Sequence, residues 1–273
     1  MRRGAERLTA HMEGLRTSGR KALVTYVTAG HPDRARSVEL LQGLEAAGAD
    51  CIELGVPFSD PLADGPVIQR SSQIAIAQGM HFDGALELVR TSGLRIPVVL
   101  FSYLNPILSA GPDALERAAQ AGVSGVLVTD LPLGADSERE AWFGESSLAY
   151  VRLVAPTTPA ARMAAIAKHG SGFVYLISRL GVTGISDVLA SDLPETIARL
   201  RSVTSIPICV GFGISTAEQA RRVGALADGV VVGSALVQAA ESSIAAALDL
   251  VRSLRGGLDE HDAVAVEHTH ATG

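Results

Sequence analysis

Eight apolar runs, each followed by a stretch of helical spacing, constrain the fold of this 273-residue chain more than any other feature. The runs are rich in residues that favour strands, and the stretches between them place apolar residues three and four positions apart. In order, the runs are ALVTYVTAG from Ala22, DCIELG from Asp50, PVVLFSY from Pro97, GVLVTDLP from Gly125, LAYVRLVAP from Leu148, FVYLISR from Phe173, IPICVGFG from Ile206 and DGVVVGSAL from Asp228.

This alternation predicts a single-domain α/β fold, a (β/α)₈ TIM barrel, because continuous apolar strands separated by helices form parallel sheets. Only 4% of the residues are aromatic, which suits tightly packed parallel strands covered by helices. An open doubly wound sheet is the alternative, but no Gly-x-Gly-x-x-Gly turn follows the first run. We expect the barrel domain to cover residues 1–255, with an extra amphipathic helix before Ala22. Residues 256–273 are polar, and we expect a disordered tail there rather than a metal site made by its histidines.

Charge and cysteine content exclude several classes of protein. A net charge of −6 argues against a nucleic-acid surface, which needs a basic face. Cys51 and Cys209 each lie in or beside an apolar run, so we interpret them as buried thiols and expect no metal site. No run is long enough to span a membrane and no secretory segment is apparent, which predicts a cytoplasmic protein without membrane contact.

The stretch IELGVPFSDPLADGP, residues 52–66, is the first candidate for chemistry. Alternation along the strand puts Glu53 on the side opposite Ile52 and Leu54, so Glu53 should point into the barrel mouth. An apolar mouth disfavours the charged carboxylate and suits a proton shuttle, although a structural ion pair is an equal alternative. Asp60 and Asp64 follow in a proline-rich loop, where local sequence alone favours turn or cap roles for both.

Glycines near the ends of the last three strands form the second candidate. GVTG from Gly181, GFG from Gly211 and the pair Gly233 and Ser234 follow successive runs. Glycine lets backbone N–H groups approach an anion, and the loops after strands seven and eight of such barrels commonly hold a phosphate. The pattern therefore predicts a phosphorylated small molecule whose reacting part extends toward Glu53.

These segments resemble the tryptophan synthase α chain family. The matching motifs occur in the family's order from about Gly19 to about Arg255, and the stretch around Glu53 and Asp64 is the most specific. They are YVTAGHPD, IELGVPFSDPLADGP, YLNPIL, VLVTDLP, FVYLISRLGVTG, VGFGIS and GVVVGSAL. The resemblance implies a lyase that cleaves indole-3-glycerol phosphate to indole and glyceraldehyde 3-phosphate, as the α subunit of an α2β2 heterotetramer. It also implies no cofactor in this chain, with pyridoxal phosphate in the partner β subunit.

The resemblance also assigns individual residues. Glu53 and Asp64 match the catalytic carboxylates, and Asp60, Pro61 and Leu62 fall where the family faces its β subunit. The positions around the indole are Tyr26, Phe101, Tyr103, Tyr175 and Phe212, and the phosphate clamp is Gly184, Gly213, Gly233 and Ser234. Tyr26 and Phe101 replace a phenylalanine and a leucine common in the family.

Some positions depart from the family pattern without touching the expected chemistry. His31 stands where an acidic residue is usual, Arg70 follows the second loop, and ISDV follows GVTG without the basic residue often found there. Two other functions stay open on the sequence: a stand-alone indole-3-glycerol phosphate lyase, and a non-catalytic subunit that activates its partner. Intact Glu53 and Asp64 argue against the second of these.

Overall fold

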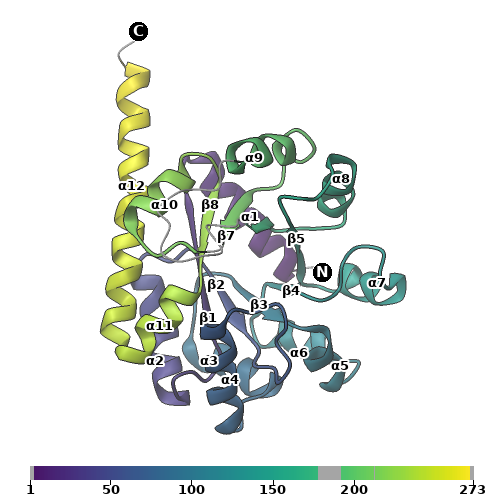
Figure 1. Cartoon of the computed structure of the whole chain (residues 1–273). Coiled ribbons are helices and arrows are strands. Elements are labelled where there is room, and N and C mark those ends of the chain that lie inside the picture. The colour runs from purple at the N-terminus through teal and green to yellow at the C-terminus, as the bar shows by residue number, and fades with distance from the viewer. Residues whose placement is uncertain (1–2, 178–191, 212, 271–273) are drawn as a thin grey trace.

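The strands form a closed parallel barrel in which each strand pairs with its neighbours in sequence and β8 pairs with β1. The computed structural model describes residues 3–177, 192–211 and 213–270 (Figure 1). The predicted TIM barrel is confirmed, and each apolar run contributes one strand. The strands are β1 (Ala22–Thr28), β2 (Cys51–Gly55), β3 (Val98–Ser102), β4 (Gly125–Val128), β5 (Ala149–Val154), β6 (Val174–Ile177), β7 (Ile208–Gly211) and β8 (Gly229–Val232).

Helices surround the barrel and return the chain from the end of one strand to the start of the next (Figure 1). Two helices, rather than one, follow each of β2, β3 and β8. The helices are α1 (Arg3–Thr17), α2 (Arg34–Ala46), α3 (Pro66–Ala77), α4 (Phe82–Ser92), α5 (Leu104–Ser109), α6 (Ala114–Gln120), α7 (Ser137–Glu145), α8 (Ala160–Lys168), α9 (Leu193–Arg201), α10 (Ala217–Gly224), α11 (Ser234–Ser242) and α12 (Ile244–His270). None of these helices combines the length and apolar character needed to cross a membrane.

Alternation along the strands divides the apolar residues into two layers. Ile52 and Leu54 of β2 belong to the large layer between strands and helices, whereas Cys51 belongs to the cluster inside the barrel. The Glu53 side chain therefore points into the barrel, as the sequence predicts. Cys51 and Cys209 are both free and buried, as expected.

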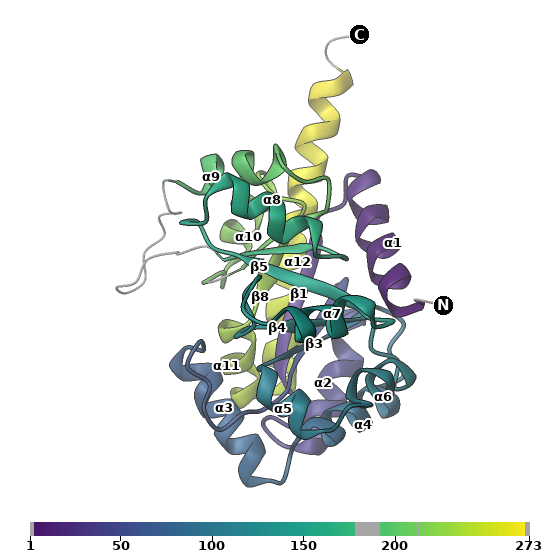
Figure 2. The same cartoon turned by 90° about the vertical axis from the view of Figure 1, so that its right-hand side faces the viewer.

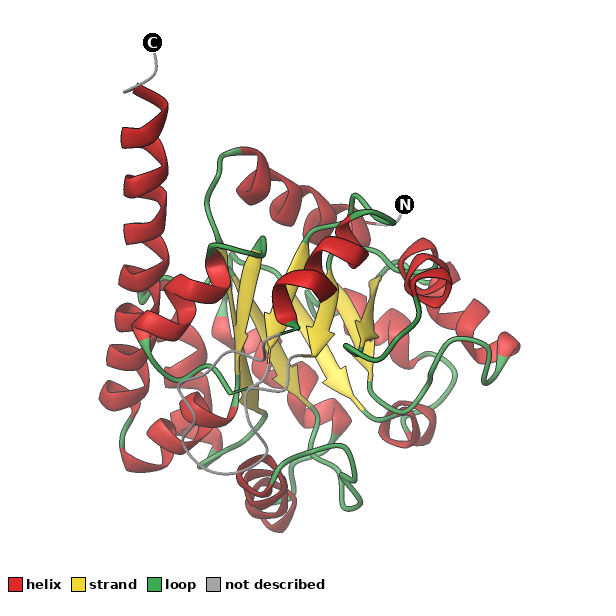
Figure 3. Ribbon diagram, turned by 45° about the horizontal axis from the view of Figure 1, so that its top comes forward, coloured by secondary structure: helices red, strands yellow, loops and turns green. Residues whose placement is uncertain are grey.

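Helix α1 closes the end of the barrel where the strands begin, as Figure 3 shows. Its Leu8 and Met12 are buried and join the cluster inside the barrel. This is the extra N-terminal helix predicted from the sequence. Because this end is filled with apolar side chains, the opposite end is the one left for a site.

The end of the chain differs from the expected disordered tail. Helix α12 runs from Ile244 to His270 without a break after Arg255, and it stands along one side of the barrel in Figures 1 and 2. Leu258 is fully buried, and a Cβ at Gly224 of α10 would lie 2.7 Å from its Cδ2 atom. The polar composition of residues 256–273 concealed this apolar contact between two helices.

Candidate active site

Glu53 lies at the centre of the candidate site, inside the barrel near the end of β2. Its neighbours across the sheet are Tyr26 of β1 and Val99 of β3. The side chain is fully buried, and neither carboxyl oxygen has a hydrogen-bond partner among the described residues. Burial without a partner raises the pKa of Glu53 to about 8, so the carboxyl is largely protonated at neutral pH. The described ion pairs do not include Glu53, so they give no support to the structural alternative.

Two tyrosines extend over neighbouring strand ends toward Glu53. Tyr26 meets Phe101 edge to face, with ring centroids 5.2 Å apart, and Tyr175 projects from β6 on the other side. A Cβ at Gly55 would collide with the Tyr26 hydroxyl, and one at Gly211 would collide with the Tyr175 hydroxyl. Burial, followed by the nearby Glu53, raises the pKa of Tyr175, so its phenol stays neutral beside the carboxyl.

Asp64 lies in the loop between β2 and α3, where Tyr103 holds it. The Tyr103 hydroxyl accepts a hydrogen bond of 2.8 Å from the backbone N–H of Ala63. It also interacts with the Asp64 carboxylate through a side-chain hydrogen bond. Burial raises the pKa of Asp64 to about 6, and the hydrogen bond from Tyr103 works in the opposite direction. Asp64 is therefore largely ionised at neutral pH, while Glu53 is largely protonated.

Tyr26 lies near both candidate carboxyls, Glu53 on the strand and Asp64 on the loop. Burial raises its pKa well above the ordinary value, and Asp64 and Glu53 both add to the shift, which places both carboxyls near its phenol. The same ring packs against Ile68 of α3 and Val237 of α11. Of the predicted aromatic positions, Tyr26, Phe101, Tyr103 and Tyr175 thus gather near the two carboxyls, whereas Phe212 lies outside the described residues.

The described phosphate positions, Gly213, Gly233 and Ser234, lie at the same end of the barrel. Gly233 immediately precedes α11, which begins at Ser234, and a Cβ at Gly233 would lie 3.5 Å from the Cβ of Tyr26. Gly213 has a φ of 83°, a left-handed conformation that favours glycine. Backbone N–H groups at a helix start can bind an anion. Gly184 lies outside the described residues.

Comparisons with known proteins agree on one family. The family model described as "Tryptophan synthase alpha chain" matches residues 12–264. The chain belongs to the tryptophan synthase alpha chain family. The alpha chain of Laribacter hongkongensis (strain HLHK9) is 47% identical over 256 residues, covering 92% of this chain and 97% of that protein. The alpha chain of Citrifermentans bemidjiense is 48% identical over 237 residues, covering 85% and 88%.

Solved structures give the same answer at the level of the fold. A tryptophan synthase structure from Mycobacterium tuberculosis matches with a TM-score of 0.85 and 36% identity, covering 93% of this chain and 98% of that one. The tryptophan synthase subunit alpha of Legionella pneumophila str. Paris matches with a TM-score of 0.85 and 35% identity, with the same coverage.

The loop that the family resemblance assigned to a partner is only partly exposed. Asp60 is exposed, and the Leu62 side chain is 93% exposed, the largest value among the exposed large apolar residues. Pro61, which the family resemblance placed at the same surface, is buried. The exposed surface of this part of the loop is therefore centred on Leu62 and Asp60.

Several residues around the site could not be found from local sequence. The Gln69 side chain on α3 donates to the backbone carbonyl of Asp64 at 2.9 Å, and so holds the loop from its other side. Thr28 and Ser71 share a hydrogen bond of 2.7 Å, which joins β1 to α3, and Tyr26 Oη lies 3.4 Å from Thr28 Oγ1. The Thr28–Ser71 contact joins residues 43 positions apart on separate elements, so no local motif marks it.

The two unusual residues His31 and Arg70 meet at one carboxylate. Glu241 of α11 pairs with Arg70 of α3, and its Oε1 lies 3.4 Å from His31 Nε2. Burial lowers the pKa of His31, and Glu241 opposes that shift. Two of the three departures from the family pattern, His31 and Arg70, therefore meet at Glu241 of α11.

Proposed function

We propose that Glu53 and Asp64 catalyse cleavage of indole-3-glycerol phosphate to indole and glyceraldehyde 3-phosphate, the lyase activity of this family in tryptophan biosynthesis. The observation that carries the assignment is the Glu53 carboxyl, fully buried and without a hydrogen-bond partner among the described residues. Such a group has no described structural role, and a raised pKa in a barrel mouth is typical of a proton-transfer group.

The reaction requires an electron sink at the carbon that leaves. Protonation of indole C3 provides it, because the positive charge then resides at the ring nitrogen. Glu53, with a pKa of about 8, carries the proton to C3 and afterwards takes the proton of the glycerol hydroxyl next to the breaking bond. The C–C electron pair returns to the ring, the hydroxyl carbon becomes the aldehyde, and Glu53 regains its starting protonation state.

Asp64 fits the complementary role. Its pKa of about 6 leaves it ionised at neutral pH, so it can accept a hydrogen bond from the indole N–H as positive charge develops there. Tyr103 and Gln69 hold the loop in a position where the carboxylate lies near Tyr26. The phosphate would lie at the start of α11, with backbone N–H groups and Ser234 as donors and Gly184 and Gly213 as further contacts.

As a member of this family, the chain works in a complex with the tryptophan synthase β subunit, which carries the pyridoxal phosphate. We propose an α2β2 stoichiometry, a cytoplasmic location, and docking of the β subunit on the loop that exposes Asp60 and Leu62. A large apolar side chain that is almost fully exposed is a contact candidate. Docking there would favour the loop position that brings Asp64 to the substrate.

Indole release measured against β-subunit concentration tests the proposal. Wild type should be slow alone and faster with partner. Asp60→Ala should lose more of the activation than of the basal rate, whereas Asp64→Ala should lose both. Asp113→Ala, at an exposed site outside the loop, is the matched control.

The same titration separates the alternatives. Full activity without any β subunit would favour the stand-alone lyase. No cleavage under any condition, together with stimulation of the β reaction, would favour the activating subunit. Equal fold-activation of wild type and Asp60→Ala at saturating partner would remove Asp60 from the interface.

A further inference from the structure

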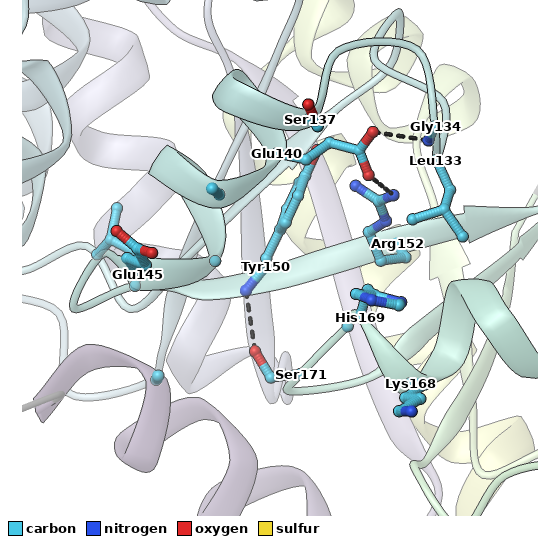
Figure 4. Close-up of a pocket in the computed structure, with 15 residues that line it drawn as sticks. Leu133, Gly134, Ser137, Glu140, Glu145, Tyr150, Arg152, Lys168, His169 and Ser171 are labelled. Atoms are coloured by element: carbon cyan, nitrogen blue, oxygen red, sulfur yellow. Dashed lines mark hydrogen bonds and ion pairs between the residues drawn. The ribbon is translucent and has the colours of Figure 1, made fainter.

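A cavity of about 630 Å³ lies on the outside of the barrel, over β5 and between α7 and α8 (Figure 4). Tyr150 and Leu148 line it, and both belong to the outer apolar layer, whereas Ala149 and Val151 of the same strand face the barrel interior. The cavity therefore lies across the strand from Glu53 and is separate from the candidate active site. Its volume is within the range of small-molecule sites.

Arg152 is the central group of this cavity. Only 4% of its side chain is exposed, and its guanidinium lies over the Tyr150 ring at 4.4 Å from the centroid. Its Nη2 donates to Glu140 Oε2 at 3.1 Å. The other oxygen of Glu140 accepts the Gly134 N–H at 2.7 Å, so both carboxylate oxygens are in use (Figure 4).

Two buried donors beside this ion pair have no partner among the described residues. They are Arg152 Nη1 and the Tyr150 hydroxyl, each on a side chain that is only 4% exposed. A buried polar atom without a hydrogen bond is costly, more so on a charged group. Burial raises the pKa of Tyr150, and the neighbouring Arg152 opposes this shift without cancelling it, so the hydroxyl keeps the proton that it can donate. Both side chains line the cavity but neither atom is exposed, so an acceptor can reach them only when the Tyr150 ring shifts.

The remaining lining indicates the rest of the ligand. Ala5, Leu133, Ala141 and Leu148 supply apolar walls, and Lys168 places a positive charge at the rim. Arg152 Nη1 is a donor only, and so is Lys168, whereas the Glu140 acceptors are already paired. The Glu145 carboxylate also lines the cavity, but it lies on the other side of Tyr150 from Arg152 (Figure 4), so the part of the site beside Arg152 offers donors to an anion. Of the common anions, a carboxylate on a small hydrocarbon body matches both the donors and the walls.

We propose that the cavity between α7 and α8 binds a small organic carboxylate, whose oxygens accept from Arg152 Nη1 and the Tyr150 hydroxyl. The body of the ligand lies against Leu133 and Leu148. Because Glu140 already neutralises Arg152, the affinity for a ligand the size of benzoate is on the order of 1 mM.

Calorimetric and NMR titrations with benzoate, on the full chain, test the proposal. Wild type binds benzoate, and benzamide of the same shape binds at least about 10-fold more weakly, because bonds to a charged acceptor are stronger. Tyr150→Phe weakens benzoate about 5-fold without lowering the melting temperature, since it removes a hydroxyl that has no partner. The double variant Arg152→Met with Glu140→Gln, which removes the pair without leaving a lone charge, weakens benzoate at least about 10-fold.

Arg90→Met, an exposed arginine on α4, is the matched control and leaves the affinity unchanged. The proposal is overturned if benzoate fails to bind wild type at 50-fold above the expected constant, or if benzamide binds equally well. Unchanged benzoate affinity in both Tyr150→Phe and the double variant also overturns it, because benzoate then binds elsewhere, such as the barrel mouth. A crystal structure grown with benzoate that shows only water between Arg152 Nη1 and the Tyr150 hydroxyl has the same consequence.

Discussion

Asp50 and Glu53 are two buried carboxylates three positions apart, one at the start of β2 and one near its end. Asp50 accepts from the backbone N–H of Leu23 at 2.9 Å and pairs with Arg20 and Arg255, each at 3.1 Å. Glu53 has no partner at either oxygen among the described residues. The same strand therefore carries one carboxylate that is fully compensated and one that is not.

This difference between the two carboxylates corresponds to the two ends of the barrel. The end that holds Asp50 is closed by α1, and its buried charge links the first strand to α12 through Arg255. The end that holds Glu53 is lined by tyrosines and followed by loops. A buried acid without a partner lowers the stability of the folded protein. Such groups are typical of functional sites, where a substrate can supply the missing partner. On this comparison, we expect Asp50 to contribute to stability and Glu53 to turnover.

The largest effect is expected from removing the proton of Glu53. Glu53→Gln keeps the size of the side chain but cannot transfer a proton, so kcat should fall by about 10²–10⁴-fold. Binding of glycerol phosphate should change little, since the phosphate positions lie on other strands. Single-turnover cleavage and calorimetry with glycerol phosphate measure the two quantities. Near-normal kcat in a folded Glu53→Gln protein would contradict the assignment.

The opposite pattern is expected for Asp50. Asp50→Asn removes the buried partner of Arg255, which is 7% exposed and keeps only the half-exposed Asp259, and breaking such a buried pair costs about 3–5 kcal/mol of stability. Cleavage by the folded fraction should stay close to wild type. Urea unfolding and kcat at low temperature separate the two outcomes. If Asp50→Asn lowered kcat as strongly as Glu53→Gln, the division between the two ends would be wrong.

The sequence predicted the barrel because its strands are continuous apolar runs, and alternation along β2 was enough to direct Glu53 inward. The sequence could not show whether Glu53 is a catalytic group or part of a structural ion pair. That depends on which side chains β1, β3 and β6 place beside it. Asp64 shows the same limit. Its local sequence favours a cap role, and its contact with Tyr103 joins residues separated by a strand and two helices. Leu258 was missed because polar neighbours hide its contact with Gly224.

A third prediction uses pH to measure the cost of the uncompensated acid. Folding raises the pKa of Glu53 from 4.5 to about 8, so between these values the folded state binds more protons than the unfolded state. Stability from this group is therefore present below pH 4.5 and is lost as the pH rises toward 8. Relative to Glu53→Gln, wild type should lose about 2–4 kcal/mol between pH 5 and pH 8.5.

Urea unfolding of both proteins at the two pH values gives this difference, and groups common to both proteins cancel. Glu39→Gln, at an exposed position on α2, controls for the substitution itself. A wild-type to Glu53→Gln difference that does not change with pH would show that Glu53 has a compensating partner in solution.

The smallest effect concerns the loop that carries Asp64. Gln69 donates to the carbonyls of Asp64 and Pro61, at 2.9 and 3.5 Å, so it favours the loop position seen here. Gln69→Met keeps the length and removes these bonds, which should cost about 1 kcal/mol and lower basal cleavage about 5-fold. Because the β subunit would favour the same loop position, saturating partner should restore most of the loss, as it should not for Asp64→Ala. Gln73→Met, exposed one turn further along α3, is the matched control. A loss in Gln69→Met that the β subunit leaves unchanged would mean that Gln69 does not act through the position of the loop, and the contrast between a fixed strand acid and a movable loop acid would fail.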